Sequence, residues 1–280
     1  MFSNLKNYLN MKEVSAKWLK WTSVLLLAAM VYGCSTVPIT GRKQLNLVSD
    51  SEMMAMSFSQ YDQFLKENKL STNTQQTEMV KRVGNKIAKA VEQYMSDNGY
   101  SAHIKDFAWE FNLVDDDTPN AWCMPGGKVV FYTGILPFTQ NEEGLAVVMG
   151  HEIAHAVAKH GNERMSHQMG VQMGGAALSV AINEKPEETK AIYMAAFGLG
   201  SQVGFMLPYS RTHEIEADKM GLIFMAMAGY NPEAAVPFWK RMGEGGGQKP
   251  PEFLSTHPAD DTRVKTLQEY MPEALKYYKK

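Results

Sequence analysis

The sequence predicts an α+β fold that is mostly α-helical, with a small antiparallel sheet next to one central helix. Apolar residues recur at helical spacing over most of the chain after residue 51. Residues 107–113 instead alternate between apolar and polar, and two short runs around a Pro-Gly-Gly turn follow them. Residues 141–160 then show a helical pattern that contains the sequence HExxH at 151–155.

Composition places the chain in an ordinary globular class. It has 280 residues, of which 45% are hydrophobic and 21% charged, enough for one domain with a sizeable core and a targeting segment. The formal net charge is -2 and the pI is about 6.4, so no basic footprint favours a nucleic-acid partner.

The first 33 residues have the pattern of a signal peptide. Residues 21–31 form an apolar run that is too short for a membrane span but suits a signal sequence. The run ends in Val-Tyr-Gly-Cys at 31–34, which resembles a bacterial lipobox whose Cys34 becomes diacylated; an ordinary exported protein cut nearby is the alternative. The positive residues that precede the run are Lys6, Lys12, Lys17 and Lys20.

This pattern predicts a lipoprotein signal peptide over 1–33, a tether over 34–50 and one domain over 51–280. Lipidated Cys34 would anchor the protein to a membrane, since two or more acyl chains hold stably. Ser35 follows the cysteine without an acidic run, which by resemblance to bacterial sorting rules indicates the outer membrane, facing the periplasm. Only Cys123 remains, so the mature chain can form no internal disulfide.

Before the HExxH helix, two predicted helices are followed by three predicted strands. Residues 51–68 and 75–97 are predicted helices that cover the core. Residues 107–113 are predicted to form a strand, and residues 121–124 and 128–133 a hairpin that leads into the central helix.

After the HExxH helix, the prediction is helical throughout. The Met- and Gly-rich stretches 165–182 and 191–207 are predicted to be packed helices, because neither is long or clean enough for a membrane span. Three more helices are predicted, at 209–228, 231–242 and 260–280, and a flexible loop is predicted at 243–251.

The HExxH motif suits a metal site. On a helix, positions i and i+4 share a face, so the imidazoles of His151 and His155 point to one spot. Thr139 stands three residues before Glu142, which is the spacing of a capping box at a helix start. The alternative is two packed helical histidines beside a surface Glu152.

A catalytic zinc site needs a third protein ligand. The metzincin pattern fails, because Ala158 and Gly161 stand where it requires a glycine and a histidine. His160 lies five residues beyond His155, which turns it off the ligand face of a continuous helix and makes it a polar helix-end residue. His213 and His167 have no spacing in their favour.

A glutamate on a later helix fits better. Glu214 and Asp218 share one helix face, with Glu214 placed for the metal and Asp218 placed to hold a ligand imidazole. Ala217 and Gly221 beside them suit close helix packing, whereas the alternative is a solvated acidic face.

Three motifs in this order carry a family resemblance. They are HExxH, the segment Ser-Arg-Thr-His-Glu-Ile-Glu-Ala-Asp at 210–218, and His257-Pro258 with Arg263 five residues after the proline. Together with Asn120-Ala121 before the Pro-Gly-Gly turn, they resemble the gluzincin family of the CAAX prenyl endopeptidase, the mitochondrial overlapping-activity peptidase and bacterial periplasmic quality-control peptidases. The match covers about 51–280 and implies a zincin-like metallopeptidase fold. With a lipid anchor and no predicted membrane-spanning helix, the chain resembles the soluble periplasmic branch of the family.

The resemblance and the residues assign the same roles. His151, His155 and Glu214 are expected to hold one Zn²⁺ per chain, and Glu152 is expected to act as general base. His257 is expected either to stabilise the oxyanion or to cap the metal when no substrate is bound; the alternative is a loop histidine packed by Pro258. Arg211 and Arg263 are expected to hold the surrounding segments together through carboxylate pairs. An extended peptide is expected to add to an edge strand made of Lys128, Val129, Val130, Phe131 and Tyr132.

The function predicted from the sequence is therefore a zinc metalloendopeptidase in the periplasm that cleaves unfolded or misassembled envelope proteins. One alternative is a chaperone-like lipoprotein that binds such proteins while its metal site is idle. Intact Glu152 argues against it, since a binding protein has no use for the base. Another alternative is a metal-scavenging lipoprotein, which a site behind helices fits poorly.

Overall fold

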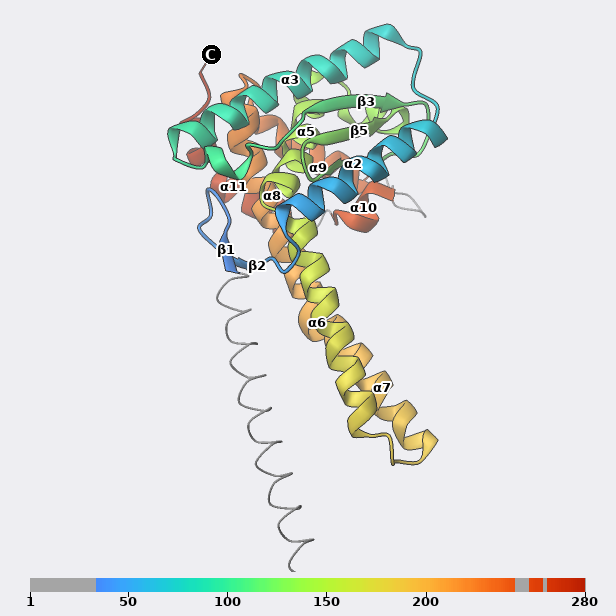
Figure 1. Ribbon diagram of the computed structural model, residues 1–280. Helices are drawn as coiled ribbons and strands as arrows, with labels where there is room; N and C mark the ends of the chain where they lie inside the picture. The colour runs from blue at the N-terminus through green and yellow to red at the C-terminus, as the bar shows by residue number, and fades with distance from the viewer. Residues whose placement is uncertain (1–33, 245–251, 259–260, 280) are drawn as a thin grey trace, which may run out of the picture.

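A body of packed helices and a small sheet carries a long helical hairpin that projects from it (Figure 1). The computed structural model describes residues 34–244, 252–258 and 261–279. The predicted signal peptide and most of the predicted glycine loop lie outside the described residues. Within the described part the chain is mostly helical with small sheets, which confirms the predicted fold class.

The cover of the body consists of the two predicted helices, and each begins at a side-chain cap. Helix α2 (Asp50–Glu67) starts with a capping box between Ser49 and Glu52. Helix α3 (Thr74–Asp97) starts where the Asn73 side chain accepts from the backbone N–H of Gln76. Figure 1 shows α3 lying across the sheet and α2 along its other side.

The sheet is not purely antiparallel as predicted. Strands β4 (Ala121–Met124) and β5 (Lys128–Tyr132) form the expected antiparallel hairpin, but β3 (Glu110–Val114) pairs with β5 in parallel, in the order β3-β5-β4. Strand β5 is therefore the central strand. Its consecutive residues Val129, Val130 and Phe131 are all fully buried, a continuous apolar run typical of a strand covered on both faces.

The central helix ends earlier than predicted. Helix α5 (Glu142–Val157) is capped by the Asn141 side chain, and Lys159 adopts a left-handed conformation with φ 57° before α6 (His160–Ala181) begins. This turn redirects the chain within two residues, so His160 does not continue along the surface of α5.

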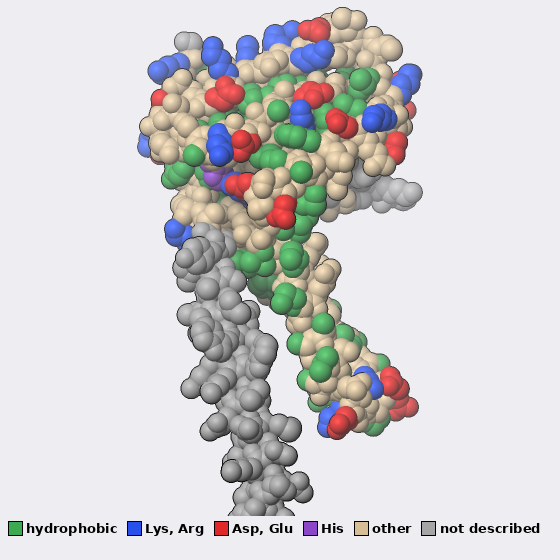
Figure 2. All heavy atoms as spheres, in the orientation of Figure 1, with side chains coloured by type: hydrophobic (Ala, Val, Ile, Leu, Met, Phe, Trp, Pro, Cys, Tyr) green, Lys and Arg blue, Asp and Glu red, His purple; other side chains and the backbone are tan. Residues whose placement is uncertain are grey.

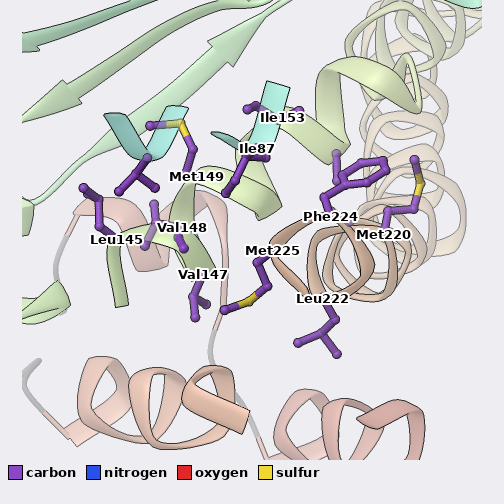
Figure 3. Packing of buried hydrophobic residues seen from close by; sticks show 14 of the residues in the cluster. Ile87, Leu145, Val147, Val148, Met149, Ile153, Met220, Leu222, Phe224 and Met225 are labelled. Atoms are coloured by element: carbon purple, nitrogen blue, oxygen red, sulfur yellow. The ribbon is translucent and has the colours of Figure 1, made fainter. Parts of the chain in front are cut away.

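Helix α5 packs against α8 (Leu207–Met227) in the middle of the body. Side chains from α5, α8 and Ile87 of α3 fill the space around them (Figure 3). At the point of closest approach Gly150 faces Gly221: a Cβ added at Gly221 would lie 2.9 Å from the backbone nitrogen of His151. Two glycines thus let the two backbones approach to contact.

The segment 34–50, predicted as a tether, is folded against the body. Strands β1 (Cys34–Thr36) and β2 (Lys43–Leu45) form an antiparallel hairpin against the body. Val37 is fully buried, and the backbone N–H of Leu47 donates to Ser166 Oγ on α6. The apolar contacts and hydrogen bonds fix this segment in place.

Helices α6 and α7 (Glu187–Ser201) form the projecting hairpin, which joins α8 through a π-helical stretch at Gln202–Met206. The prediction that its Met- and Gly-rich stretches pack into the core is wrong, because residues such as Met173 (65%) and Val180 (79%) are exposed. The continuous helix Glu187–Met227 is also long and apolar enough to cross a membrane, contrary to the sequence prediction.

The remaining elements close the body around α5 and α8. They are the short helices Ser101–His103, Thr133–Ile135 and Pro232–Ala234, and α4 (Leu136–Thr139), α9 (Ala235–Glu244), α10 (Glu252–Thr256) and α11 (Asp261–Leu275). Helix α11 packs against α8 and α9, which brings Arg263 in its first turn next to His151 of the HExxH helix.

We predict that Gly221→Ala destabilises the protein although alanine favours helix formation by about 1 kcal/mol. The added methyl group would push α8 away from α5, and overpacking of this kind costs about 1–3 kcal/mol. The matched control is Gly170→Ala in α6, where a Cβ meets nothing within 4 Å. Thermal unfolding should show a lower midpoint for Gly221→Ala only; equal midpoints for the two variants would contradict close packing at the crossing.

Candidate metal centre and active site

Four side chains from three parts of the chain converge in the interior. His151 and His155 come from α5, Glu214 comes from α8 and His257 follows α10, and one donor atom of each lies within 4.8 Å of all the others. All four residues are at least 91% buried, since their exposed fractions are 1%, 8%, 6% and 9%. The crossing of α5 and α8 therefore brings together the three residues that the sequence predicted as ligands.

The spacing of these atoms fits a metal ion. The Nε2 atoms of His151 and His155 lie 3.1 Å apart, and the two carboxylate oxygens of Glu214 lie 3.3 and 3.4 Å from them. Bonds of about 2.0–2.1 Å in a tetrahedral zinc site place neighbouring ligand atoms about 3.3 Å apart. Imidazole and carboxylate donors at this separation form a suitable set for zinc.

The proton arrangement on His151 supports the same conclusion. His151 Nδ1 lies 2.9 Å from Asp218 Oδ1 and donates its proton to it, so Nε2 faces the centre. Burial and Arg263 oppose a charge on His151, but its hydrogen bonds with Asp218 and Glu214 raise its pKa to about 9, so a metal ion at Nε2 would replace a proton there. Burial works against ionisation of Asp218, but Arg263 and His151 hold its pKa below the ordinary value. Arg263 donates to both Asp218 oxygens, at 2.6 and 2.7 Å. Asp218 and Arg263 therefore lie where they can fix the ring of His151.

His155 is oriented by a second chain of contacts, which sequence reasoning missed. His160 Nε2 lies 3.0 Å from Glu216 Oε2, and His160 Nδ1 lies 2.8 Å from His155 Nδ1. If Glu216 accepts from His160, then His160 accepts from His155, and His155 Nε2 keeps its lone pair for the centre. Burial lowers the pKa of His155 and of His160 well below the ordinary value, so both rings are neutral as this arrangement requires.

The position of His160 corrects the prediction that it is only a polar helix-end residue. In a continuous helix it would point away from His155, but the left-handed turn at Lys159 brings it back. The centroids of the His155 and His160 rings lie 4.9 Å apart.

A buried ionic cluster lies behind His160. Arg42, from the segment predicted as a tether, donates to Glu163 at 2.7 and 2.8 Å and to Glu216 at 2.7 and 2.9 Å. His213 Nε2 lies 2.7 Å from Glu163. Burial opposes ionisation of Glu163, but its hydrogen bonds with Arg42 and His213 lower its pKa to about 2. No periodicity in the sequence around Arg42 indicated this role.

Arg211 does not take part in such a pair, which corrects the prediction made for it. The residue is exposed on α8 near the base of the projecting hairpin, and it forms no ion pair or hydrogen bond with any described residue. The carboxylates closest to the site are already bound by Arg42 and Arg263. The cation that joins the segments around Glu216 therefore comes from the N-terminal hairpin.

Glu152 lies beside the donor cluster, and one of its carboxylate oxygens is unpaired within the described part of the chain. Its side chain is 3% exposed, and Oε1 is a buried atom without a hydrogen-bond partner among the described residues. Oε1 lies 3.5 Å from His257 Nε2. Burial raises the pKa of Glu152. A carboxylate kept free next to a metal centre is suited to accept a proton from water.

His257 occupies the side of the centre that faces Glu152. Its Nδ1 lies 3.1 Å from His151 Nε2 and 3.0 Å from Glu214 Oε2. The ring stacks on Phe253 with centroids 4.6 Å apart, and Phe253 in turn stacks on Trp239. The aromatic stack holds His257 where a fourth metal ligand would lie.

A cleft of about 320 Å³ opens next to Glu152 and His155. Its lining includes Ala121, Trp122 and Cys123 of β4 and Met53 and Met54 of α2. Strand β5 does not line the cleft, and both of its edges are already paired, so the prediction that Lys128 to Tyr132 form the edge strand is wrong. The edge strand at the cleft is β4.

Comparison with known proteins agrees with this geometry. The model of peptidase family M48 matches residues 75–271. The chain is 33% identical over 244 residues to the mitochondrial metalloendopeptidase OMA1 of Schizosaccharomyces pombe, covering 85% of this chain and 66% of that protein. It is 32% identical to the metalloendopeptidase OMA1 of Homo sapiens, over 85% of this chain and 46% of that protein.

A bacterial relative matches a smaller part of the chain. It is the beta-barrel assembly-enhancing protease of Escherichia coli, 28% identical over 161 residues, which is 56% of this chain and 33% of that protein. The chain thus spans between one third and two thirds of the length of these three relatives.

We predict that Arg42→Gln weakens metal binding although Arg42 does not touch the donor cluster. Without the cation, Glu163 and Glu216 lose their partner, and His160 no longer fixes the ring of His155. Loss of a residue that orients a metal ligand typically lowers the affinity for the metal about 10–100-fold. The control is Arg82→Gln, which removes an exposed pair with Glu142. Zinc titration should separate the two variants, and unchanged affinity in a folded Arg42→Gln protein would exclude this positioning role.

Proposed function

The chain belongs to peptidase family M48, and we propose that it is a zinc-dependent metalloendopeptidase that cleaves unfolded or misassembled polypeptides of the cell envelope. The observation that carries the proposal is the free carboxylate of Glu152 beside four converging donors, at the end of a cleft with an edge strand. The named relatives are themselves metalloendopeptidases or a protease.

In the proposed mechanism, His151, His155 and Glu214 hold one zinc ion per chain. Bound zinc supplies Lewis-acid chemistry, which polarises a peptide carbonyl and lowers the pKa of a water molecule. Glu152 Oε1 takes the proton of the attacking water and later passes it to the leaving amine. Asp218 keeps the proton on His151 Nδ1, and His160 does the same for His155, so neither ring can turn its Nε2 away from the centre.

The substrate is proposed to bind as an extended strand along β4. One edge of β4 pairs with β5, and residues of β4 line the cleft that contains Glu152. Backbone pairing at such an edge recognises extended chains with little dependence on side chains. This mode favours unfolded or misassembled proteins, because a folded protein offers few unpaired extended segments.

The location is proposed to be the bacterial cell envelope, with a lipid on Cys34 as one anchor. Val-Tyr-Gly-Cys at 31–34 supports lipidation, and the E. coli relative is by name a factor in β-barrel assembly. Cys34 is the first residue of β1, so an attached lipid would sit at the β1–β2 hairpin that also provides Arg42.

His257 is proposed to cap the metal in the resting enzyme. Its Nδ1 lies at hydrogen-bond distance from donor atoms of both His151 and Glu214, which is where water or a carbonyl oxygen has to bind during catalysis. Turnover then requires His257 to leave this position. The other role considered, stabilisation of the oxyanion, requires the ring to stay near the reacting carbonyl.

Replacing Glu152 with Gln is expected to abolish proteolysis and leave zinc and substrate binding intact. Loss of a general base typically lowers the rate by about 10²–10⁴-fold. Cleavage of an unfolded protein such as casein by purified, zinc-loaded wild type and variant provides the measurement. Glu110→Gln serves as control, because this carboxylate on β3 pairs with Lys128 and does not line the cleft.

The same experiment separates the peptidase from a chaperone-like binding protein. A chaperone predicts that wild type binds the unfolded protein and protects it from aggregation without cutting, and that Glu152→Gln behaves like wild type. That result, obtained with zinc-loaded protein of both kinds, would remove the peptidase proposal.

His257→Ala is expected to raise the basal rate of cleavage several-fold while zinc stays bound by the other three ligands. The reason is that the fourth position becomes open to water without a conformational change. The measurement is the initial rate of cleavage at equal zinc content, with His103→Ala as a control histidine whose ring contacts the carbonyl of Val157. A fall in kcat of about 10²–10³-fold would instead assign His257 to the oxyanion.

A further inference from the structure

The projecting hairpin has two uncharged helical segments with charges only at their ends. Residues 165–183 and 191–210 contain no Asp, Glu, Lys or Arg. Arg164 precedes the first segment and Arg211 follows the second, and the turn between them carries Glu184, Lys185, Glu187, Glu188 and Lys190. Figure 2 shows this arrangement on the visible face, with red and blue side chains gathered at the tip.

The length of these segments matches a bilayer. Each has about 20 residues, which in a helix extends about 30 Å, equal to the thickness of the hydrocarbon core of a membrane. The helix Glu187–Met227, which contains the second segment, meets the length and composition of a membrane-crossing helix, and the apolar stretch that meets them is 0% buried. Helix α6 has the length but not the mean hydropathy of such a helix, so it would enter the bilayer as the partner of α7.

On α7 the exposed apolar residues do not form one stripe for one partner. Ile192, Tyr193 and Met194 are 69%, 52% and 37% exposed, and consecutive positions on a helix point about 100° apart. Between the helices lie small residues instead: a Cβ at Gly174 would be 3.1 Å from the Phe197 ring, and one at Gly175 would be 3.4 Å from it. Small residues inside and apolar residues outside are typical of helix pairs in membranes, where the surrounding lipid is apolar.

We propose that the α6–α7 hairpin inserts lengthwise into a lipid bilayer, with its charged turn at the far interface. A second copy of the chain or a polypeptide would cover one face of the hairpin, whereas lipid covers all sides at once. The base of the hairpin lies beside the β1–β2 hairpin, since Leu47 N donates to Ser166 Oγ, so the proposed lipid on Cys34 and the hairpin would enter the bilayer from the same side of the body. This proposal does not depend on peptidase activity.

Site-specific fluorescence quenching in vesicles tests the insertion. The full chain with Cys34→Ser and Cys123→Ser carries one new cysteine at a time, labelled with bimane and reconstituted into phosphatidylethanolamine–phosphatidylglycerol vesicles that contain lipids brominated in the acyl chains. Val180→Cys and Leu199→Cys probe the hairpin, and Leu70→Cys and Leu275→Cys probe exposed apolar positions on the body. Each probe reports the depth of its own position in the bilayer. Attachment of the chain to the vesicle through residues 1–33 therefore does not by itself produce quenching at the hairpin probes.

Insertion predicts that the acyl-chain bromines quench both hairpin probes several-fold more strongly than both body probes. It also predicts that a cysteine in the turn, Thr189→Cys, reacts with a membrane-impermeant thiol reagent on only one side of the vesicle, opposite to the body probes. Equal quenching at hairpin and body would overturn the proposal. So would hairpin probes that escape the bromines but quench one another as the protein concentration rises, because that result identifies a second copy as the occupant.

Discussion

The contact between two helix backbones at Gly150 and Gly221 is the constraint on which the candidate site depends. A metal ligand set with donor atoms about 3 Å apart leaves no room for ordinary side chains between the helices that provide it. The chain meets this requirement with glycine on both sides of the crossing, so that His151, next to one glycine, can reach Glu214, two turns before the other. The apolar residues around the crossing then hold the two helices together without entering the site.

Around this contact the interior contains charges that a protein normally keeps at its surface. Asp218, Glu163 and Glu216 are almost completely buried, and each is matched by an arginine or a histidine. Such pairs add little net stability compared with apolar packing, because removing both charges from water costs about as much as their attraction returns. Their effect is instead to fix the orientation of the histidine rings. Each carboxylate fixes which nitrogen of a histidine carries the proton, and the remaining lone pairs of His151 and His155 point at one place.

Local signals were sufficient to predict much of this arrangement. HExxH at i and i+4, and Glu214 with Asp218 at the same spacing, place side chains on a helix face whatever the rest of the fold does. What failed depended on contacts between distant segments. One left-handed residue, Lys159, moved His160 into the site, and no apolar period around Arg42 showed that its segment docks against α6. Strand order failed for a related reason, since the hairpin pattern of β4 and β5 does not say on which side β3 will pair, although the unbroken Val-Val-Phe run of β5 was a signal for a central strand.

Helix α8 connects the two parts of the molecule, because it carries Glu214 and Asp218 in the body and continues without interruption into α7. If residue 210 marks the edge of the proposed membrane segment, Glu214 lies about 6 Å further along the helix axis. The cleft beside it would then open close to the headgroup region of the bilayer, and the helix would prevent the body from tilting far from that position. A peptidase held in this way would reach polypeptides at or near the membrane surface before those in bulk solution. Its selectivity would arise from the height of the cleft above the bilayer, while the edge strand β4 remains tolerant of sequence.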